Sequence, residues 1–119
     1  MGIQIAAVTM RLIFLINLVL GILFWTGHAD PLVIVHMLLG IVFVALLFFA
    51  GTLQAMAGGP IGLMGGTFAV GLLLAIIGFV QDDTGWLKIV HVLVALAAIG
   101  LAEMSFGRYR RLSAARAAK

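Results

Sequence analysis

The sequence has no cysteine and very few charged residues. Cysteine is absent from all 119 positions, which excludes disulfide bonds, thiolate metal sites, iron–sulfur clusters and the covalent attachment of c-type haem. Charged residues make up 9% and hydrophobic residues 65% of the chain, against about 25% and roughly 45–50% in an average soluble domain. A soluble fold of this size could not cover so much apolar surface. The composition therefore excludes a soluble enzyme, a nucleic-acid-binding domain and a disordered tail, and it predicts a chain that lies in lipid.

Two long stretches of the sequence have no charged residue, and a third has only two. None occurs in residues 12–29 or 31–81, and Lys88 and Glu103 are the only ones in residues 84–107. Turn-forming sequences at 28–31, 57–60 and 81–85 cut these stretches into lengths of about 20 residues, as a hydrocarbon core of roughly 30 Å requires. Helices are expected throughout, because lipid offers the backbone no hydrogen-bond partners and the sequence lacks the alternation of barrel strands. The predicted spans are about 9–27, 32–56, 61–80 and 86–107.

Basic and acidic residues gather at opposite ends of this predicted bundle. Six of the seven Lys and Arg residues lie beside the two termini, and three of the four acidic residues (Asp30, Asp82 and Asp83) lie in the opposite loops. The positive-inside rule then places both termini in the cytoplasm, with residues 108–119 as a basic cytoplasmic tail that touches anionic lipid and not nucleic acid. We expect an all-α integral membrane protein, a single-domain four-helix bundle of the bacterial inner membrane.

The sequence matches itself at a shift of 55 residues. Residues 32–36 (LVIVH) align with 87–91 (LKIVH), and residues 22–24 (ILF) align with 77–79 (IGF). The matched histidines and phenylalanines carry the argument, because chance matches among leucine, isoleucine and valine are frequent in apolar sequences. The repeat predicts two helical hairpins in the same orientation, related by a pseudo-two-fold axis along the membrane normal.

The repeat makes His36 and His91 equivalent, each at the outer start of a span. At 1.5 Å per residue both lie roughly 7–9 Å below the outer helix ends. A histidine inside a membrane is a functional candidate by default. Two neutral imidazoles that face each other at one depth suit haem iron, which takes two axial nitrogens on opposite faces of a flat macrocycle. A chlorophyll-type pigment, another metal and a purely structural polar contact are the alternatives.

Small and basic residues beside the two histidines favour the haem interpretation. Gly40 and Ala95 each follow a histidine by four residues, so they leave room on the same helix face one turn deeper. Lys88 precedes His91 by one turn, which places a cation where an anionic propionate would end. This lysine has no equivalent on the second span.

Aromatic residues and a third histidine lie in the same outer layer. Phe24 and Phe79 can flank a macrocycle or belong to an ordinary core. His28 and Trp86 offer further hydrogen-bond donors to the propionates. As a loop residue, His28 can also be a solvent-facing side chain or a ligand to a second cofactor shared with a neighbour.

In these features the chain resembles the bis-histidine b-type cytochromes of four-helix membrane bundles. The likeness lies in the four spans and in the Val-His motifs at His36 and His91, and it covers most of residues 9–107. It implies one non-covalent haem b (heme b) per chain and one-electron transfer. The small size of the chain predicts a subunit or a homo-oligomer that is not by itself a complete enzyme. Many such cytochromes hold two haems on four histidines, but this chain has no histidine in its inner half. The alternatives are a structural, assembly or pigment-binding subunit of a larger membrane complex, and a small-solute transporter.

Three further features predict helix packing. Asn17, at the middle of the first span, is expected to form a hydrogen bond between helices. Glu103 is expected to pair with Arg110, seven residues further along one helix face. Gly62 and Gly66 form a GxxxG pattern, which is typical of close helix packing.

Overall fold

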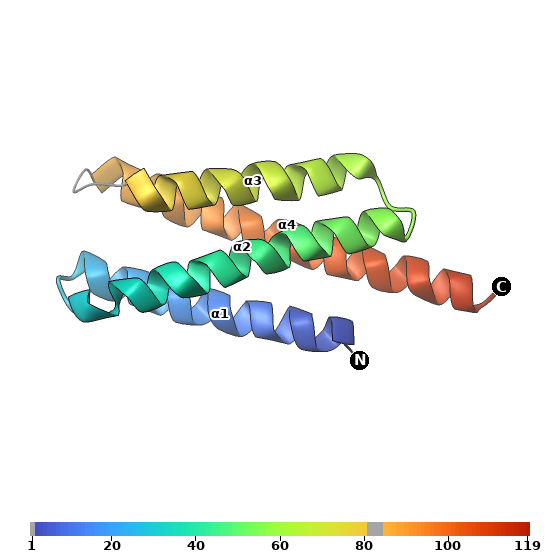
Figure 1. Cartoon of the computed structure of the whole chain (residues 1–119), viewed down its shortest axis with the longest axis horizontal. Helices are drawn as coiled ribbons and strands as arrows, with labels where there is room; N and C mark the ends of the chain where they lie inside the picture. The colour runs from blue at the N-terminus through green and yellow to red at the C-terminus, as the bar shows by residue number, and fades with distance from the viewer. Residues whose placement is uncertain (1, 81–84) are drawn as a thin grey trace.

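The computed structural model describes residues 2–80 and 85–119, which form four long helices (Figure 1). Each helix is long and apolar enough to cross a membrane, and the described residues include no strand. The all-α membrane bundle is therefore confirmed, whereas the internal repeat stays a prediction. The predicted turn at 81–85, apart from Gly85, and the acidic residues Asp82 and Asp83 lie outside the described residues. The helices are α1 (Gly2–Trp25), α2 (Val33–Met56), α3 (Ile61–Val80) and α4 (Gly85–Ala117), with a short 3-10 helix η1 (Asp30–Leu32) before α2.

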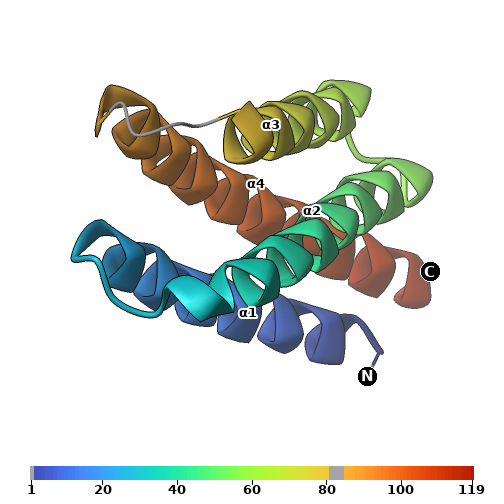
Figure 2. The ribbon, with the colours of Figure 1, turned by 60° about the vertical axis from the view of Figure 1, so that its left-hand side comes forward.

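Helices α2 and α4 form the middle of the bundle. They pack against each other, and both α1 and α3 pack against the two of them. Figure 2 shows the chain as two hairpins, α1–α2 and α3–α4. Both termini lie at one end, which we call the proximal end; the distal end is where α1 and α3 finish and α2 and α4 begin (Figure 1).

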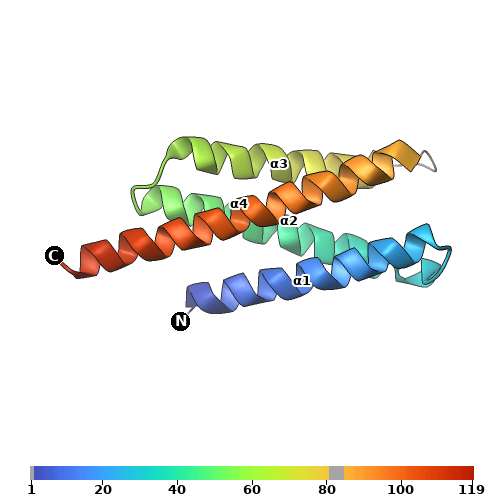
Figure 3. The same ribbon diagram turned by 180° about the vertical axis from the view of Figure 1, so that it is seen from behind.

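Two helix boundaries differ from the prediction. Helix α1 begins at Gly2 and not near residue 9, because the sequence before Arg11 contains no helix-breaking residue after that glycine. Helix α4 continues to Ala117, so most of the basic tail at 108–119 is helical. Alanine, arginine and leucine, which dominate the tail, are strong helix formers. Figure 3 shows this end of α4 projecting beyond the other helices.

The proximal half of the bundle contains the tightest packing. Leu47, Ala50 and Ala98 are completely buried. Helix α2 approaches α3 closely at Gly51, where an added Cβ would collide with the Thr67 hydroxyl. The predicted glycine pair makes no such contact, because nothing lies within 4 Å of the Cβ positions of Gly62 and Gly66. The glycines that bring helices together within this chain are therefore not those of the GxxxG pattern.

A buried glutamine closes the turn between α2 and α3. Gln54 is fully buried, and its Nε2 donates to the carbonyl oxygens of Gly51 at 3.1 Å and Pro60 at 3.0 Å. Gly58 has φ +94°, a conformation that glycine adopts without strain. The side-chain amide thus links the last turns of α2 to the residue that precedes α3.

The prediction that Glu103 pairs with Arg110 is wrong, because Glu103 pairs with Arg11. Nε and Nη2 of Arg11 donate to the two carboxylate oxygens at 2.6 and 2.8 Å, a bidentate geometry that joins α1 to α4. Since α1 starts earlier than expected, Arg11 lies about 13 Å into its helix and alongside Glu103. The spacing within α4 could not show this, because the partner comes from the other end of the chain.

Candidate cofactor site

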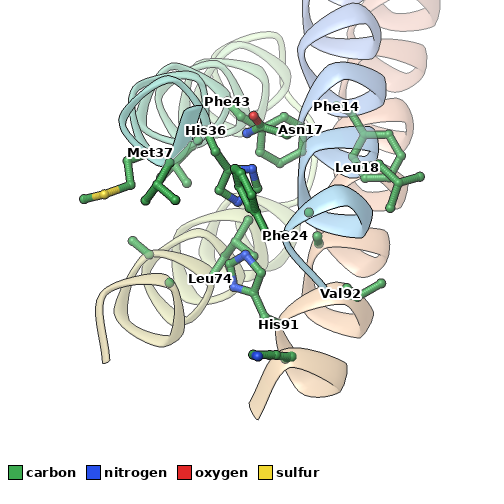
Figure 4. Close-up of a pocket in the computed structure, with 18 of the residues that line it drawn as sticks. Phe14, Asn17, Leu18, Phe24, His36, Met37, Phe43, Leu74, His91 and Val92 are labelled. Atoms are coloured by element: carbon green, nitrogen blue, oxygen red, sulfur yellow. The ribbon is translucent and has the colours of Figure 1, made fainter. Parts of the chain in front are cut away.

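A cavity of about 820 Å³ occupies the distal half of the bundle and is lined by all four helices (Figure 4). Its volume lies in the upper part of the range of about 300–1,000 Å³ that is usual for ligand sites. Among the described residues that line it, only Asn17, His36, Lys88 and His91 carry an amide or an ionisable group. Because protein interiors are normally close-packed, a cavity of this size identifies the candidate site.

Small residues on all four helices create this space. The aromatic rings of Phe14 and Phe43, with centroids 6.1 Å apart, pack together at the deeper end, where the cavity meets the proximal core. The glycine and alanine residues that line the cavity are Gly21, Gly40, Ala75, Gly78 and Ala95.

His36 from α2 and His91 from α4 face each other across the cavity. Their ring centroids are 6.3 Å apart, with an angle of 52° between the ring planes (Figure 4). Both side chains are partly buried, and each Nδ1 is buried without a hydrogen-bond partner in the part of the chain that the structure describes. Each ring lies over a glycine of the preceding helix: an added Cβ would stand 3.9 Å from His36 Cε1 at Gly21 and 3.3 Å from His91 Cε1 at Gly78.

This donor set fits a metal that brings most of its own ligands. Within residues 2–80 and 85–119, no cluster of three or more His, Cys, Asp or Glu side chains could hold a bare metal ion. A structural zinc ion takes about four protein ligands, whereas haem iron needs only two axial ligands. Two nitrogens on opposite sides of one metal, about 2 Å from it, would place the ring centroids about 6 Å apart. The observed 6.3 Å separation fits that arrangement.

Five of the other seven residues predicted for the site line the cavity with the histidines. The Phe24 ring packs edge-on against His36, with centroids 5.4 Å apart and an interplanar angle of 84°. Lys88 lies near the distal start of α4, in a position to meet an anionic edge of a ligand. The five are Phe24, Gly40, Phe79, Lys88 and Ala95.

His28 and Trp86 lie outside this cavity. Helix α1 ends in a Schellman motif, in which the amides of Gly27 and His28 donate to the carbonyls of Phe24 and Leu23. The Thr26 hydroxyl donates to the Leu23 carbonyl at 2.9 Å, so its oxygen accepts the Nδ1–H of His28 at 3.0 Å. Local hydrogen bonds thus account for His28. Trp86 is 64% exposed at the distal end of α4, as is typical of the aromatic belt of membrane proteins.

Sequence reasoning did not assign Asn17 to the site. The structure places this residue in the cavity wall, with Nδ2 3.7 Å from the Cβ position of Gly40. Its Oδ1 is buried and has no hydrogen-bond partner among the described residues, so the expected helix-to-helix bond through this oxygen is not formed. A signal was present in the sequence: Phe14, Asn17, Leu18 and Gly21 recur at spacings of three and four residues, which puts them on one helix face.

The distal cavity therefore combines two facing imidazoles, an amide, a lysine and apolar walls. Such a site can hold a flat, largely apolar ligand that has a metal at its centre and an anionic edge. Comparison with known proteins gives no independent indication of function: no protein-family model, characterised protein or solved structure matches this chain.

Proposed function

We propose that this protein is a membrane-bound haem b protein in which His36 and His91 are the axial ligands. The observation that carries the proposal is the pair of facing imidazoles, 6.3 Å apart, in a cavity whose walls are mostly apolar. When bound, haem iron supplies reversible one-electron oxidation and reduction. The protein then acts as an electron carrier, as a homo-oligomer or as a subunit of a larger complex.

The residues around the histidines have distinct parts in this proposal. His36 and His91 would hold the haem iron through their imidazole rings, and two protein ligands would favour electron transfer over reactions that need an open position on the metal. Gly40 and Ala95 leave room one turn deeper, and the apolar walls exclude water and so influence the potential. Lys88 offers its ammonium group to a propionate, which is a charge-assisted hydrogen bond.

The site lies near one end of the bundle, and this position limits the redox partner. With both termini in the cytoplasm, as the charge distribution indicates, the distal end faces the opposite side of a bacterial inner membrane. Electrons would then exchange with a partner at that surface, such as a periplasmic carrier, a quinone head group or a neighbouring complex.

The test is the absorption spectrum of the protein purified in detergent after expression with added haem precursor. We expect the reduced-minus-oxidised spectrum to show the α-band of low-spin haem b, and mass spectrometry of the extracted pigment to separate haem from a chlorophyll-type molecule. His36→Gly and His91→Gly should abolish the band while circular dichroism shows an intact helical fold, and added imidazole should restore it. His28→Ala is the matched control, because His28 lies outside the cavity. A folded but colourless wild-type protein, or a band that survives both glycine substitutions, would refute the proposal.

A further inference from the structure

Two buried polar atoms without partners belong to the same wall of the cavity. Asn17 Oδ1 on α1 can only accept a hydrogen bond, and His36 Nδ1 on α2 can donate one when it carries the ring proton. The described residues give neither atom a partner. A buried polar group that lacks a partner destabilises the structure, so a pair of this kind indicates a missing interaction.

The packing of α1 against α2 places Asn17 and His36 in one interface, each beside a glycine of the other helix. The Asn17 amide lies over Gly40, and the His36 ring lies over Gly21. Gly21 follows Asn17 by four residues and Gly40 follows His36 by four, so each polar residue and glycine share one helix face. Because the two helices run in opposite directions, Asn17 and His36 occupy adjacent levels of one interface.

His91 has no comparable neighbour on α3. The residues that α3 contributes to the cavity are Leu74, Ala75, Gly78 and Phe79, none of which has a hydrogen-bonding side chain. The two histidines therefore differ in their surroundings, although both face the same space. Only His36 has a side-chain acceptor on the helix against which its ring packs.

From this arrangement we infer that Asn17 is the positioning residue of His36. The Asn17 carboxamide oxygen accepts the Nδ1–H of His36, and this bond directs Nε2 of the ring toward the bound metal. Rotation of the carboxamide exchanges the positions of its oxygen and nitrogen without moving α1. Histidines that bind metals almost always donate their second ring N–H to an oxygen acceptor, which makes the metal-bound nitrogen more basic. The inference rests on the proposed function, because it concerns a ligand of the same site.

The midpoint potential of the bound haem tests this role, since a residue needed only for folding would not move it in a defined direction. Asn17→Leu has a similar volume but no acceptor. We expect a higher potential, because a less basic ligand stabilises the oxidised metal less well, and roughly 10–100-fold weaker haem binding. Asn17→Asp keeps an acceptor oxygen, so its potential should lie at or below that of the wild type. Thr67→Val is the control: it removes a buried hydroxyl outside the cavity and should leave the potential unchanged.

The possible results separate this inference from the proposed function. A haem-loaded wild type with an unchanged potential in Asn17→Leu would overturn the inference and leave the proposed function standing. Potentials that rise equally in the Leu and Asp variants, or loss of haem from both, would also overturn it, because the retained acceptor would then have no effect. Loss of haem from the folded Leu variant alone would support it. A wild-type protein that binds no haem would overturn the proposed function and the inference together.

Discussion

Gly78, which lies beside His91, and Gly21, which lies beside His36, allow two matched variants to be compared for haem binding. Gly78→Ala would place a methyl group 3.3 Å from Cε1 and 3.9 Å from Nδ1 of His91. Gly21→Ala would place one 3.9 Å from Cε1 of His36, which is ordinary van der Waals contact between carbon atoms. Gly78→Ala on α3 therefore displaces the His91 ring by a few tenths of an ångström, whereas Gly21→Ala on α1 leaves the His36 ring in place.

The structure also indicates the size of the effect. A side chain about 30° from its preferred rotamer loses on the order of 0.5–1.5 kcal/mol, and a shift of a few tenths of an ångström at Cε1 needs a smaller rotation than that. Since 1.4 kcal/mol corresponds to a tenfold change in affinity, Gly78→Ala should weaken haem binding by less than tenfold, and Gly21→Ala should weaken it less. Both variants replace a glycine within a helix by alanine, which favours the helix by roughly 0.5–1 kcal/mol. Haem affinity and the stability of the haem-free protein should thus change in opposite directions in Gly78→Ala.

Haem titration of the haem-free protein in detergent measures the first quantity, and thermal unfolding followed by circular dichroism measures the second. If Gly78→Ala binds haem as tightly as the wild type, or if Gly21→Ala binds it more weakly than Gly78→Ala, the steric reasoning is incorrect. A lower melting temperature in Gly78→Ala would show that the glycine is needed for the fold and not for the position of the ring.

Three further predictions concern other parts of the bundle. Glu103→Leu should lower the melting temperature because it removes the bidentate partner of Arg11 and with it the link between α1 and α4, and the double variant with Arg11→Leu should recover most of the loss. Equal melting of the single and double variants would show that the pair is not coupled. Gly51→Ala should destabilise the protein by about 1–3 kcal/mol through overpacking. Gly62→Ala, with open space around it, should be neutral or stabilising. Denaturant titration measures the free energy of unfolding of both variants, and Gly51→Ala should be the less stable of the two. Lys88→Gln should weaken haem binding a few-fold, as expected for a partly exposed ion pair that contributes up to about 1 kcal/mol. The difference in affinity between the wild type and this variant should shrink at high salt. An unchanged affinity would show that Lys88 does not contact the haem.

The four helices could be predicted because charge is excluded from lipid, and the sequence shows directly where charge is missing. The ends of the helices could not be predicted in the same way. Gly2 and Ala117 terminate helices that extend through sequences without helix breakers, and a hydropathy pattern does not register such extensions. The pairing of Arg11 with Glu103 depends on which helices lie side by side, which is a property of the assembled bundle and not of either segment.

The candidate site shows the same division between local and tertiary information. His36 and His91 could be singled out because an imidazole in an apolar span is rare and both occur near the same end of a helix. The contribution of α1 was harder to read, because Asn17 is the one polar residue on the face that it shares with Phe14, Leu18 and Gly21, and the other faces of the helix are apolar as well. Asn17 was therefore noticed as a polar residue but not connected with His36, which comes from the next helix.

The two halves of the bundle meet opposite physical requirements. In the proximal half, Leu47, Ala98 and Phe106 are buried almost completely, and the Gly51 contact with α3 holds the helices close together. In the distal half, glycines and alanines face inward, and the same four helices enclose a cavity of about 820 Å³. Helix association in lipid depends on close packing, because lipid tails are as apolar as the side chains. The packed half can therefore fix the positions of α2 and α4, so that His36 and His91, near the distal starts of these helices, remain opposed across the cavity.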